Sequence, residues 1–247
     1  MIANLMMYNR PELAEAHSAY WNLIRQHLGN AGIASPAALS QDAEEFSVWN
    51  HPQLVLSQTC GMPYRLFLHG KVNLVGTPDF GLDGCPPGHY NSAVIVHKDD
   101  TGRALASFEH SVFAYNQNIS QSGYAAIINH TNALGLSLKQ PLQTHSHIES
   151  ARAVAEKRAA IASIDAVTWR LVEKYEPFAN EIAVLEWTTP TPGLPYITSI
   201  SQHPAPVFDA VKQAIHDLPS EAQETLGIVD LISIDAADYL AVPNPPD

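Results

Sequence analysis

The sequence predicts an α/β protein built from two units in which strands and helices alternate along the chain. Three observations predict this class. Short apolar runs typical of strands alternate with a helical pattern over residues 1–76. The alternation starts again at residue 92, after a loop at 79–88 that is rich in glycine and proline. Hydrophobic residues make up 46% of the 247 residues and charged residues 15%, against ~25% charged residues in typical domains, so the chain can fill a large core.

The first unit is predicted to begin with a strand within residues 1–8, followed by an amphipathic helix at 11–28. Apolar residues in that helix recur three and four positions apart, and Pro11 stands at the first helical position. A strand at 54–56, a short helix at 63–68 and a strand at 72–76 follow. This strand–helix–strand order predicts a parallel sheet.

The second unit continues the same alternation. Its predicted strands are 92–96, 112–115, 139–144, 160–164 and 182–187, and its predicted helices are 123–134, 148–158 and 166–175. The prolines of residues 188–193 favour an extended segment. A strand at 196–200 and helices at 206–218 and 221–226 complete the prediction.

Composition excludes several classes of protein. The chain has 13 Lys and Arg against 25 Asp and Glu, a net charge of −12, which argues against a nucleic-acid-binding protein. No apolar run approaches the ~18 residues that cross a bilayer, so we expect a chain that does not span the membrane. Residues 1–8 lack a basic segment and a cleavage site, which predicts a strand and no signal peptide. A cytoplasmic chain and a secreted chain whose leader has been removed are both consistent with this N-terminus.

Polar residues recur where a predicted strand ends and a helix begins. They are Ser57, Gln58, Thr59, Ser120, Ser122, Gly123, Tyr124, Thr144, His145, Ser146, His147 and Asp165. Ligands of open α/β sheets bind at the carboxyl ends of strands, and helix N-termini attract anions. These residues therefore predict a site for an oxyanion or a small polar ligand. Each hydroxyl taken alone could instead be a helix N-cap, which stabilises a helix by ~1 kcal/mol.

Ser120, Ser122 and Gly123 form the sharpest of these patterns. Two hydroxyls supply hydrogen bonds, and a glycine without Cβ allows a ligand to approach the backbone closely. His145 and His147 could share one face of an extended segment, but no further ligand has a recognised spacing. We therefore predict no metal site and expect His147 to form hydrogen bonds.

The cysteines and the known catalytic motifs give no catalytic prediction. Cys60 precedes Gly61 and could be a nucleophile at a helix N-terminus, but nothing in the sequence fixes a base beside it. The motifs of serine hydrolases, phosphate-binding loops, zinc proteases and dinucleotide-binding folds are absent from the sequence. Cys60 and Cys85 could form a disulfide worth roughly 3 kcal/mol, or remain two thiols, and the sequence leaves both alternatives open.

Seven segments, read together and in order, carry a family resemblance. They are residues 7–12, 56–63, 90–93, 120–123, 146–147, 162–169 and 192–199. This set resembles the phosphate/phosphonate/phosphite-binding components of ABC transporters. The resemblance implies a type II periplasmic-binding-protein fold, in which two α/β sandwich lobes are joined by two hinge strands. Lobe one would comprise residues 1–92 and 191–247, and lobe two the inserted residues 93–190.

The resemblance also implies a site, a ligand and a partner. In lobe two, the oxyanion oxygens would be held by Ser120, Ser122, Gly123 and Tyr124, with His147 beside them. In lobe one, Tyr8 would be a cleft wall and Ser57, Gln58 and Thr59 would approach the ligand. Asp165 would meet an ammonium group or a protonated oxygen. The ligand would be a small oxyanion or zwitterion without a cofactor, the partner an ABC permease and the compartment the periplasm.

Gln121 departs from the family pattern, because phosphonate binders commonly have a hydroxyl residue there. Two alternatives to a transport-binding protein follow from the residues. One is an enzyme on the same fold that modifies a small metabolite through Cys60 or His147. The other is a ligand-sensing domain that acts through a protein partner.

Overall fold

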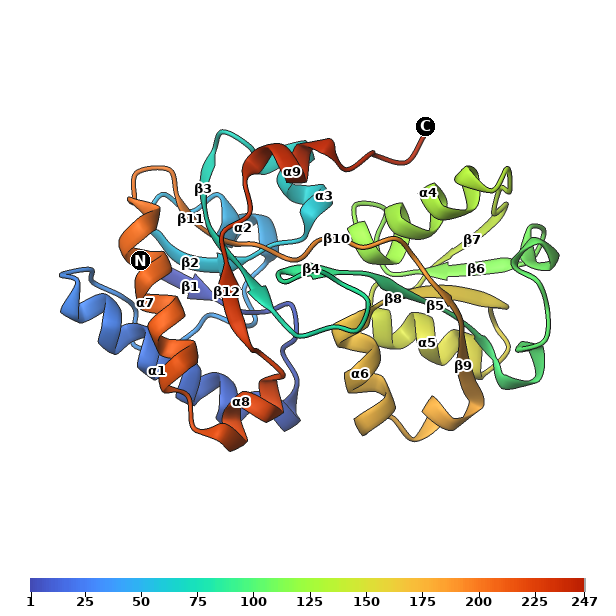
Figure 1. Ribbon diagram of the computed structural model, residues 1–247, viewed down its shortest axis with the longest axis horizontal. Helices are drawn as coiled ribbons and strands as arrows, with labels where there is room; N and C mark the ends of the chain where they lie inside the picture. Colours follow the sequence, from blue (N-terminus) through green and yellow to red (C-terminus); the bar gives the residue numbers. More distant parts are fainter. Residues whose placement is uncertain (247) are drawn as a thin grey trace. The chain divides into compact units, whose positions relative to one another are not determined.

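The computed structural model describes residues 1–246 and divides into two α/β units (Figure 1). Unit 1 comprises Met1–His89 and Pro192–Ala241, and unit 2 comprises Tyr90–Thr191 with the residues from Val242 on. The chain therefore leaves unit 1 after His89 and re-enters it at Pro192. The predicted crossings, 92/93 and 190/191, fall close to these points, whereas the predicted lobes grouped the C-terminal tail with lobe one. At the crossings, β4 (His89–Tyr90) and β10 (Thr191–Pro192) form a two-stranded sheet.

The sheet of unit 1 has the strand order β1-β2-β11-β3-β12. Its strands are β1 (Ile2–Asn4), β2 (Leu54–Gln58), β3 (Val72–Asp79), β11 (Tyr196–Ser199) and β12 (Asp230–Ile232). β1 and β2 are parallel, but β11 pairs antiparallel with both β2 and β3, and β12 pairs antiparallel with β3. The prediction of a parallel sheet is wrong here, because a strand from the returning chain inserts between two strands that follow each other in the sequence.

Helices of unit 1 come from both of its chain segments. They are α1 (Ala14–Asn30), α2 (Glu45–Trp49), α3 (Gly61–Pro63), α7 (Pro204–Asp217), α8 (Ser220–Leu226) and α9 (Ala236–Ala241), with a 3-10 turn at Pro11–Leu13 and a π-helical turn at Tyr64–Leu68. α1 packs against α7 and α8, and it buries Tyr20, Ile24 and Leu28. This is the apolar face that the sequence period predicted.

Unit 2 has a second five-stranded sheet, in the order β7-β6-β8-β5-β9. Its strands are β5 (Ser92–His97), β6 (Val112–Tyr115), β7 (Gln140–Gln143), β8 (Ile161–Asp165) and β9 (Ile182–Trp187). β6 is parallel to β7 and β8, while β5 is antiparallel to β8 and β9. The carboxyl ends of β6, β7 and β8 therefore share one edge of the sheet.

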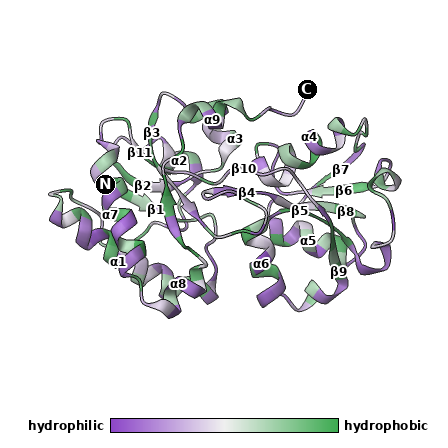
Figure 2. Cartoon of the chain, in the orientation of Figure 1, coloured by the Kyte–Doolittle hydropathy of each residue, from purple (hydrophilic) through white to green (hydrophobic). Residues whose placement is uncertain are grey.

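Both faces of this sheet are covered, which explains why β5 is apolar throughout. Ala93 and Ile95 belong to one buried cluster, and Val94 and Val96 to another, because successive side chains of a strand point to opposite faces. The covering helices are α4 (Ala126–Ala133), α5 (His147–Ala155) and α6 (Ala166–Tyr175). Figure 2 shows the hydrophobic colouring of β5 and β9 between more mixed helices.

The remaining elements are short. Unit 2 also has 3-10 turns at Lys98–Asp100, Leu105–Phe108 and Pro177–Glu181, and a π-helical turn at Gln121–Ala125 that leads into α4. Within residues 1–246, no helix combines the length and the apolar character needed to cross a membrane.

Candidate functional site

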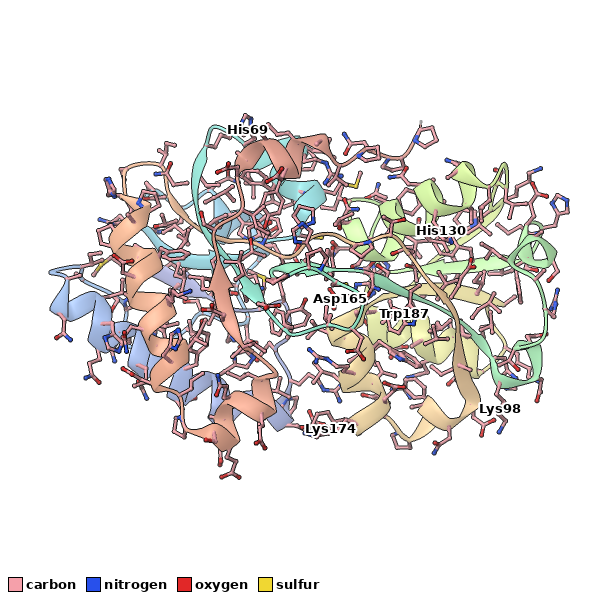
Figure 3. The ribbon with its side chains drawn as sticks, in the orientation of Figure 1. His69, Lys98, His130, Asp165, Lys174 and Trp187 are labelled. Atoms are coloured by element: carbon pink, nitrogen blue, oxygen red, sulfur yellow. The ribbon has the colours of Figure 1, made fainter. Side chains whose placement is uncertain are left out.

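Three polar loops meet the edge of the unit 2 sheet where β6, β7 and β8 end. The loop after β6 reaches Ser120 and the π-helical turn, the loop after β7 contains residues 144–146 before α5, and β8 ends at Asp165 directly before α6. Figure 3 labels Asp165 among the side chains. The parallel pairing of these strands brings sequence positions 120–165 to one edge, as the strand-end pattern predicted.

Ser120 and Asp165 both act as helix N-caps in the structure. The Ser120 Oγ accepts a hydrogen bond from the Gly123 N–H at 3.0 Å, and an Asp165 carboxylate oxygen accepts from the Thr168 N–H at 2.9 Å. Ser146 caps α5 in the same way. The capping alternative therefore holds for these residues, but a capping hydroxyl keeps its own proton as a donor.

Ser122 and His147 form a direct side-chain pair. The Ser122 Oγ lies 3.0 Å from His147 Nε2, and the Ser163 hydroxyl donates to the Ser122 carbonyl oxygen at 2.7 Å. Burial lowers the pKa of His147 to about 4, so the ring is neutral at physiological pH. The tautomer of the ring decides which of the two groups donates in this hydrogen bond.

The space beside Gly123 is filled by other side chains of unit 2. A Cβ at this position would lie 2.0 Å from Asn116 Oδ1 and 2.9 Å from His147 Cε1. The Asn116 side chain therefore occupies the space beside Gly123 that a Cβ would need. Asn116 Oδ1 is buried and has no hydrogen-bond partner within residues 1–246. The sequence reasoning missed Asn116, because it considered only the hydroxyl and amide residues directly before the helix.

The Tyr124 ring packs into an aromatic cluster on β6. Its centroid lies 5.1 Å from the Tyr115 ring and 6.5 Å from the Phe113 ring.

We call Ser120, Ser122, Gly123, Tyr124, His147 and Asp165 the unit 2 group. Ser120, Ser122, Gly123 and His147 are in direct contact, and the Ser163 hydrogen bond ties them to the strand that ends at Asp165.

The predicted residues of unit 1 lie at the end of β2. Ser57, Gln58 and Thr59 are all buried. Gln58 Nε2 donates to the Leu194 carbonyl at 3.2 Å, and the Thr59 N–H donates to the Pro195 carbonyl at 3.0 Å. The strand end is therefore fixed by the segment that follows the return crossing.

Hydroxyl groups in this region make few hydrogen bonds. The Ser57 hydroxyl donates to the Gln58 carbonyl over a long 3.4 Å. Thr59 is fully buried, and its Oγ1 has no hydrogen-bond partner among the described residues. A buried hydroxyl without a partner destabilises a fold by about 1–3 kcal/mol, so this position marks a polar group that a ligand could satisfy.

Tyr8 lies with Gln58 around a small apolar cavity of about 20 Å³ inside unit 1. The Tyr8 ring meets Phe80 edge-on, with centroids 5.3 Å apart. His17 lines the same cavity, and burial lowers the pKa of this histidine. We call Tyr8, Ser57, Gln58 and Thr59 the unit 1 group.

Cys60 and Cys85 are thiols in the structure, which is one of the two alternatives that the sequence left open. Among the described residues, no group of three His, Cys, Asp or Glu side chains could hold a metal ion.

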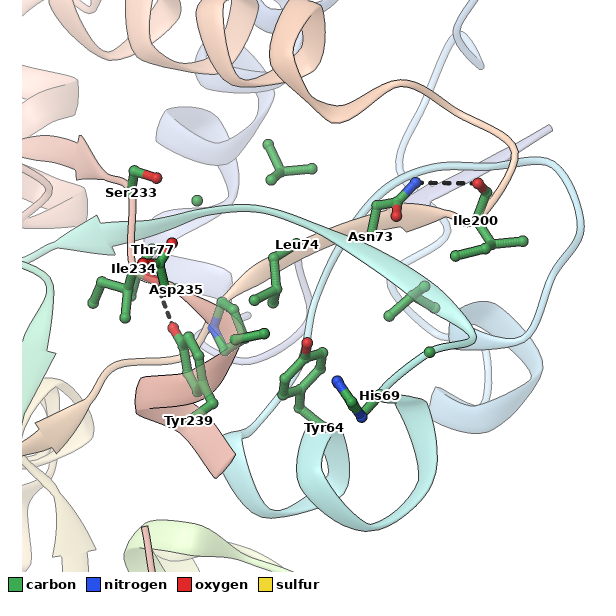
Figure 4. A pocket seen from close by; sticks show the side chains of 16 residues that line it. Tyr64, His69, Asn73, Leu74, Thr77, Ile200, Ser233, Ile234, Asp235 and Tyr239 are labelled. Atoms are coloured by element: carbon green, nitrogen blue, oxygen red, sulfur yellow. Dashed lines mark hydrogen bonds between the residues drawn. The ribbon is translucent and has the colours of Figure 1, made fainter. Parts of the chain in front are cut away.

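Two larger pockets lie elsewhere in unit 1. One has about 350 Å³ and is lined by Tyr64, His69, Asn73, Asp235 and Tyr239 among others (Figure 4). The other has about 340 Å³ between α1 and residues 37–41.

Comparison with protein families decides the class. A family model described as "ABC transporter, phosphonate, periplasmic substrate-binding protein" matches residues 56–239. The chain belongs to this family of phosphonate-binding proteins. The matched range includes every residue of the unit 2 group and three residues of the unit 1 group. No curated protein matches the sequence significantly.

Solved structures agree with the fold of a phosphonate-binding protein. PhnD1 from Prochlorococcus marinus in complex with methylphosphonate is similar with a TM-score of 0.71 at 12% identity, covering 96% of this chain and 93% of that chain. XAC2383 from Xanthomonas citri bound to ATP gives 0.70 at 15% identity, covering 96% and 91%. A binding protein component of an ABC phosphonate transporter from Pseudomonas aeruginosa gives 0.64 at 16% identity, covering 97% and 82%.

Family membership confirms the main functional prediction. The protein is a solute-binding protein of the ABC-transporter phosphonate family, and members of that family are periplasmic. The α/β architecture is the periplasmic-binding-protein fold of these neighbours. The family match favours this role over the enzyme and sensor alternatives.

Proposed function

We propose that this phosphonate-family protein captures a small phosphorus oxyanion of the phosphonate or phosphate class. Residues of both groups would take part in ligand binding, and the protein would deliver the ligand to an ABC permease in the periplasm. The observation that carries the proposal is the cluster of Ser120, Ser122 and His147 at the carboxyl edge of the unit 2 sheet. Its hydroxyls and neutral imidazole lie where two helices begin.

The chemistry of this cluster suits an oxyanion. Hydrogen bonds from neutral donors to a charged acceptor are roughly twice as strong as those between neutral groups, and the N-terminal ends of helices stabilise negative charge. The methylphosphonate complex of PhnD1, which has a similar fold, supports the same class of ligand.

Asp165 restricts the protonation state or the charge of the proposed ligand. It is buried, and a carboxylate close to a fully deprotonated oxyanion repels it unless a proton or a cation lies between them. The proposed ligand therefore carries a protonated oxygen or an ammonium group near Asp165. Gln121 supplies an amide where phosphonate binders commonly have a hydroxyl, so selectivity within the class would differ from theirs.

The Ser122–His147 pair has the distance of a nucleophile and a general base, but its environment favours binding over catalysis. Among residues 1–246, no carboxylate forms a hydrogen bond with the buried His147 Nδ1, so none orients the ring as in a catalytic triad. A pKa of about 4 also makes this imidazole a weak base at neutral pH. We propose that the pair fixes the direction of the Ser122 proton and that the protein has no turnover.

A thermal-shift screen tests the proposal. The compounds are methylphosphonate, aminomethylphosphonate, phosphate, phosphite and sulfate. A ligand at a hundred times its Kd adds ~2.7 kcal/mol, which raises the Tm of a chain of this size by roughly 5–10 °C. We expect a shift with at least one phosphorus oxyanion, and roughly half of that shift in Ser122→Ala, whose binding should be about tenfold weaker.

A matched control and a turnover assay complete the test. Thr131→Val removes another buried hydroxyl of unit 2, one that bonds only within α4, and it should keep the shift. The ³¹P spectrum of methylphosphonate should be unchanged after incubation with the protein. The absence of a shift with every phosphorus compound contradicts the proposed ligand class, and a new ³¹P resonance supports the enzyme alternative.

A further inference from the structure

The two segments that connect the units are joined by a backbone hydrogen bond inside unit 1. The Gly193 N–H donates to the Gly88 carbonyl at 2.9 Å. Gly88 directly precedes the outgoing crossing at His89, and Gly193 directly follows the return at Pro192. This bond therefore couples the positions of both connections.

Packing leaves no room for a side chain at either glycine. A Cβ on Gly193 would lie 2.9 Å from the Gly88 oxygen and 3.1 Å from Thr77 Cγ2. Gly88 has φ +71°, and its Cβ would lie 2.9 Å from Ile232 Cβ. The left-handed conformation of Gly88 also favours glycine. β3 and β12 thus enclose the base of both connections.

Tyr239 adds a polar contact to this base from α9. Its hydroxyl donates to the Gly193 carbonyl at 3.1 Å, and since that proton is used, the Thr77 hydroxyl of β3 donates to the Tyr239 oxygen. Figure 4 shows the Thr77–Tyr239 bond beside the 350 Å³ pocket. Tyr239 is 1% exposed, and its ring meets Tyr64 with centroids 5.5 Å apart.

The Tyr239 hydroxyl keeps its proton at every physiological pH, because burial raises the pKa of this group. The Tyr239 hydroxyl can therefore donate a hydrogen bond to the Gly193 carbonyl throughout the physiological pH range. Since Gly193 has both its N–H and its carbonyl in hydrogen bonds within unit 1, the backbone at the return crossing is held from two sides. Weakening of either hydrogen bond increases the conformational freedom of Gly193, the residue that follows the return crossing.

We propose that Tyr239 is a hinge-positioning residue, through which helix α9 holds Gly193 and sets how readily the protein closes on its ligand. The proposal rests on the proposed function, because a binding protein of two lobes closes when the ligand shifts its population to the closed state. Tyr239 would change ligand affinity without touching the ligand.

Amide hydrogen exchange tests the anchor without any ligand. In Tyr239→Phe the ring remains and the hydroxyl is lost, so we expect the Gly193 amide to exchange about fivefold faster, the change expected for one hydrogen bond. The control Thr198→Val removes a buried hydroxyl of the same sheet that donates to the Leu54 carbonyl, and it should leave the Gly193 rate unchanged. Thr77→Val, which keeps Tyr239, serves if Tyr239→Phe fails to fold, and it should accelerate the same amide by a smaller factor.

A second measurement separates a hinge from a static anchor. Titration with methylphosphonate should give a Kd that differs from wild type by about threefold or more in Tyr239→Phe and is unchanged in Thr198→Val. An unchanged Gly193 exchange rate overturns the proposal, and so does faster exchange with an unchanged Kd. If methylphosphonate and the other oxyanions fail to bind the wild type, the proposed function fails separately, and the exchange rates alone decide whether Tyr239 holds the crossing.

Discussion

In unit 2, Ser120, Ser122 and Asp165 each have a hydrogen-bond partner inside the unit, whereas in unit 1 the buried Thr59 hydroxyl has none within the described chain. These three side chains of unit 2 are therefore fixed before a ligand arrives, and binding loses little of their conformational entropy. The unit 1 group contains a polar atom that is unfavourable in the unbound fold. Ligand binding should relieve that cost. At Thr59, a substitution that raises the stability of the unbound protein should therefore lower its affinity for the ligand.

The largest effect should follow from adding a methyl group to Gly123. Gly123→Ala places its Cβ 2.0 Å from Asn116 Oδ1, so Asn116 must move and the Ser122–His147 pair with it. We expect a loss of about 1–3 kcal/mol in the free energy of unfolding and a loss of methylphosphonate binding of at least about a hundredfold, or ~2.7 kcal/mol. Denaturant unfolding and titration measure the two quantities.

Gly76→Ala is the matched control in unit 1. Its Cβ would lie 2.9 Å from both Leu231 Cγ and Phe208 Cδ2, so a similar loss of stability is expected without an effect on affinity. Equal effects of the two variants on affinity would show that Gly123 acts only through general stability.

The pH dependence of stability should distinguish His147 from other histidines. Burial lowers the pKa of His147 from 6.5 to about 4, so between these pH values the unfolded state binds a proton that the folded state does not. Stability from the neutral ring is complete above pH 6.5 and is lost as the pH falls toward 4, by at most about 1.4 kcal/mol per pH unit.

His147→Gln should flatten this slope. His17→Gln should flatten it less, because the pKa of His17 is lowered by burial but to a smaller extent. Unfolding in denaturant from pH 4 to pH 7 measures both slopes. A slope unchanged in His147→Gln would contradict a buried neutral imidazole.

Thr59→Val tests the opposition between stability and affinity in unit 1. The substitution keeps the shape and removes the hydroxyl without a partner, so the free energy of unfolding should stay equal or rise by about 1 kcal/mol. Methylphosphonate affinity should fall by about tenfold, or ~1.4 kcal/mol.

Thr198→Val removes a hydroxyl that donates a hydrogen bond to the Leu54 carbonyl. It should show the reverse, with a loss of about 1 kcal/mol in the free energy of unfolding and no change in methylphosphonate affinity. If Thr59→Val lowers stability as Thr198→Val does, Thr59 has a structural partner and the comparison fails.

The smallest effect concerns His145 in the loop before α5. Its φ is +68°, a conformation that is unfavourable for residues with a Cβ. His145→Gly should raise stability by up to about 1 kcal/mol after the entropy of glycine is subtracted. Lys157, with φ +58°, lies at the other end of α5 and provides the comparison. Only His145→Gly should also alter ligand affinity, because it loosens the loop that carries His147.

Local patterns in the sequence predicted most of the elements that position the site. The helical period of α1 reflects burial of one face, and the apolar run of β5 reflects burial of both faces. Both patterns can be recognised in a single sequence. The insertion of β11 between β2 and β3 depends on long-range pairing, and β12 and α9 have three and six residues, too few for a periodic signal. The helix starts at Ser120 and Asp165 were predictable because capping residues have a local signature.

The reasons behind the site residues were harder to predict than their positions. Gly123 was singled out for ligand access, and the structure adds a packing reason for glycine, because Asn116 occupies the space beside it. The backbone of Thr59 is held by the carbonyl of Pro195, which is distant in the sequence. Such contacts exist only in the folded chain.

Calorimetric titration of methylphosphonate into wild type, Thr59→Val, Ser122→Ala and the double variant tests most directly whether Thr59 and Ser122 take part in binding the oxyanion. We predict that each single variant weakens binding by about tenfold. We also predict that the double variant binds methylphosphonate more weakly than either single variant, because each substitution removes a hydroxyl that is proposed to take part in binding. Binding by the wild type that neither substitution weakens would contradict the account.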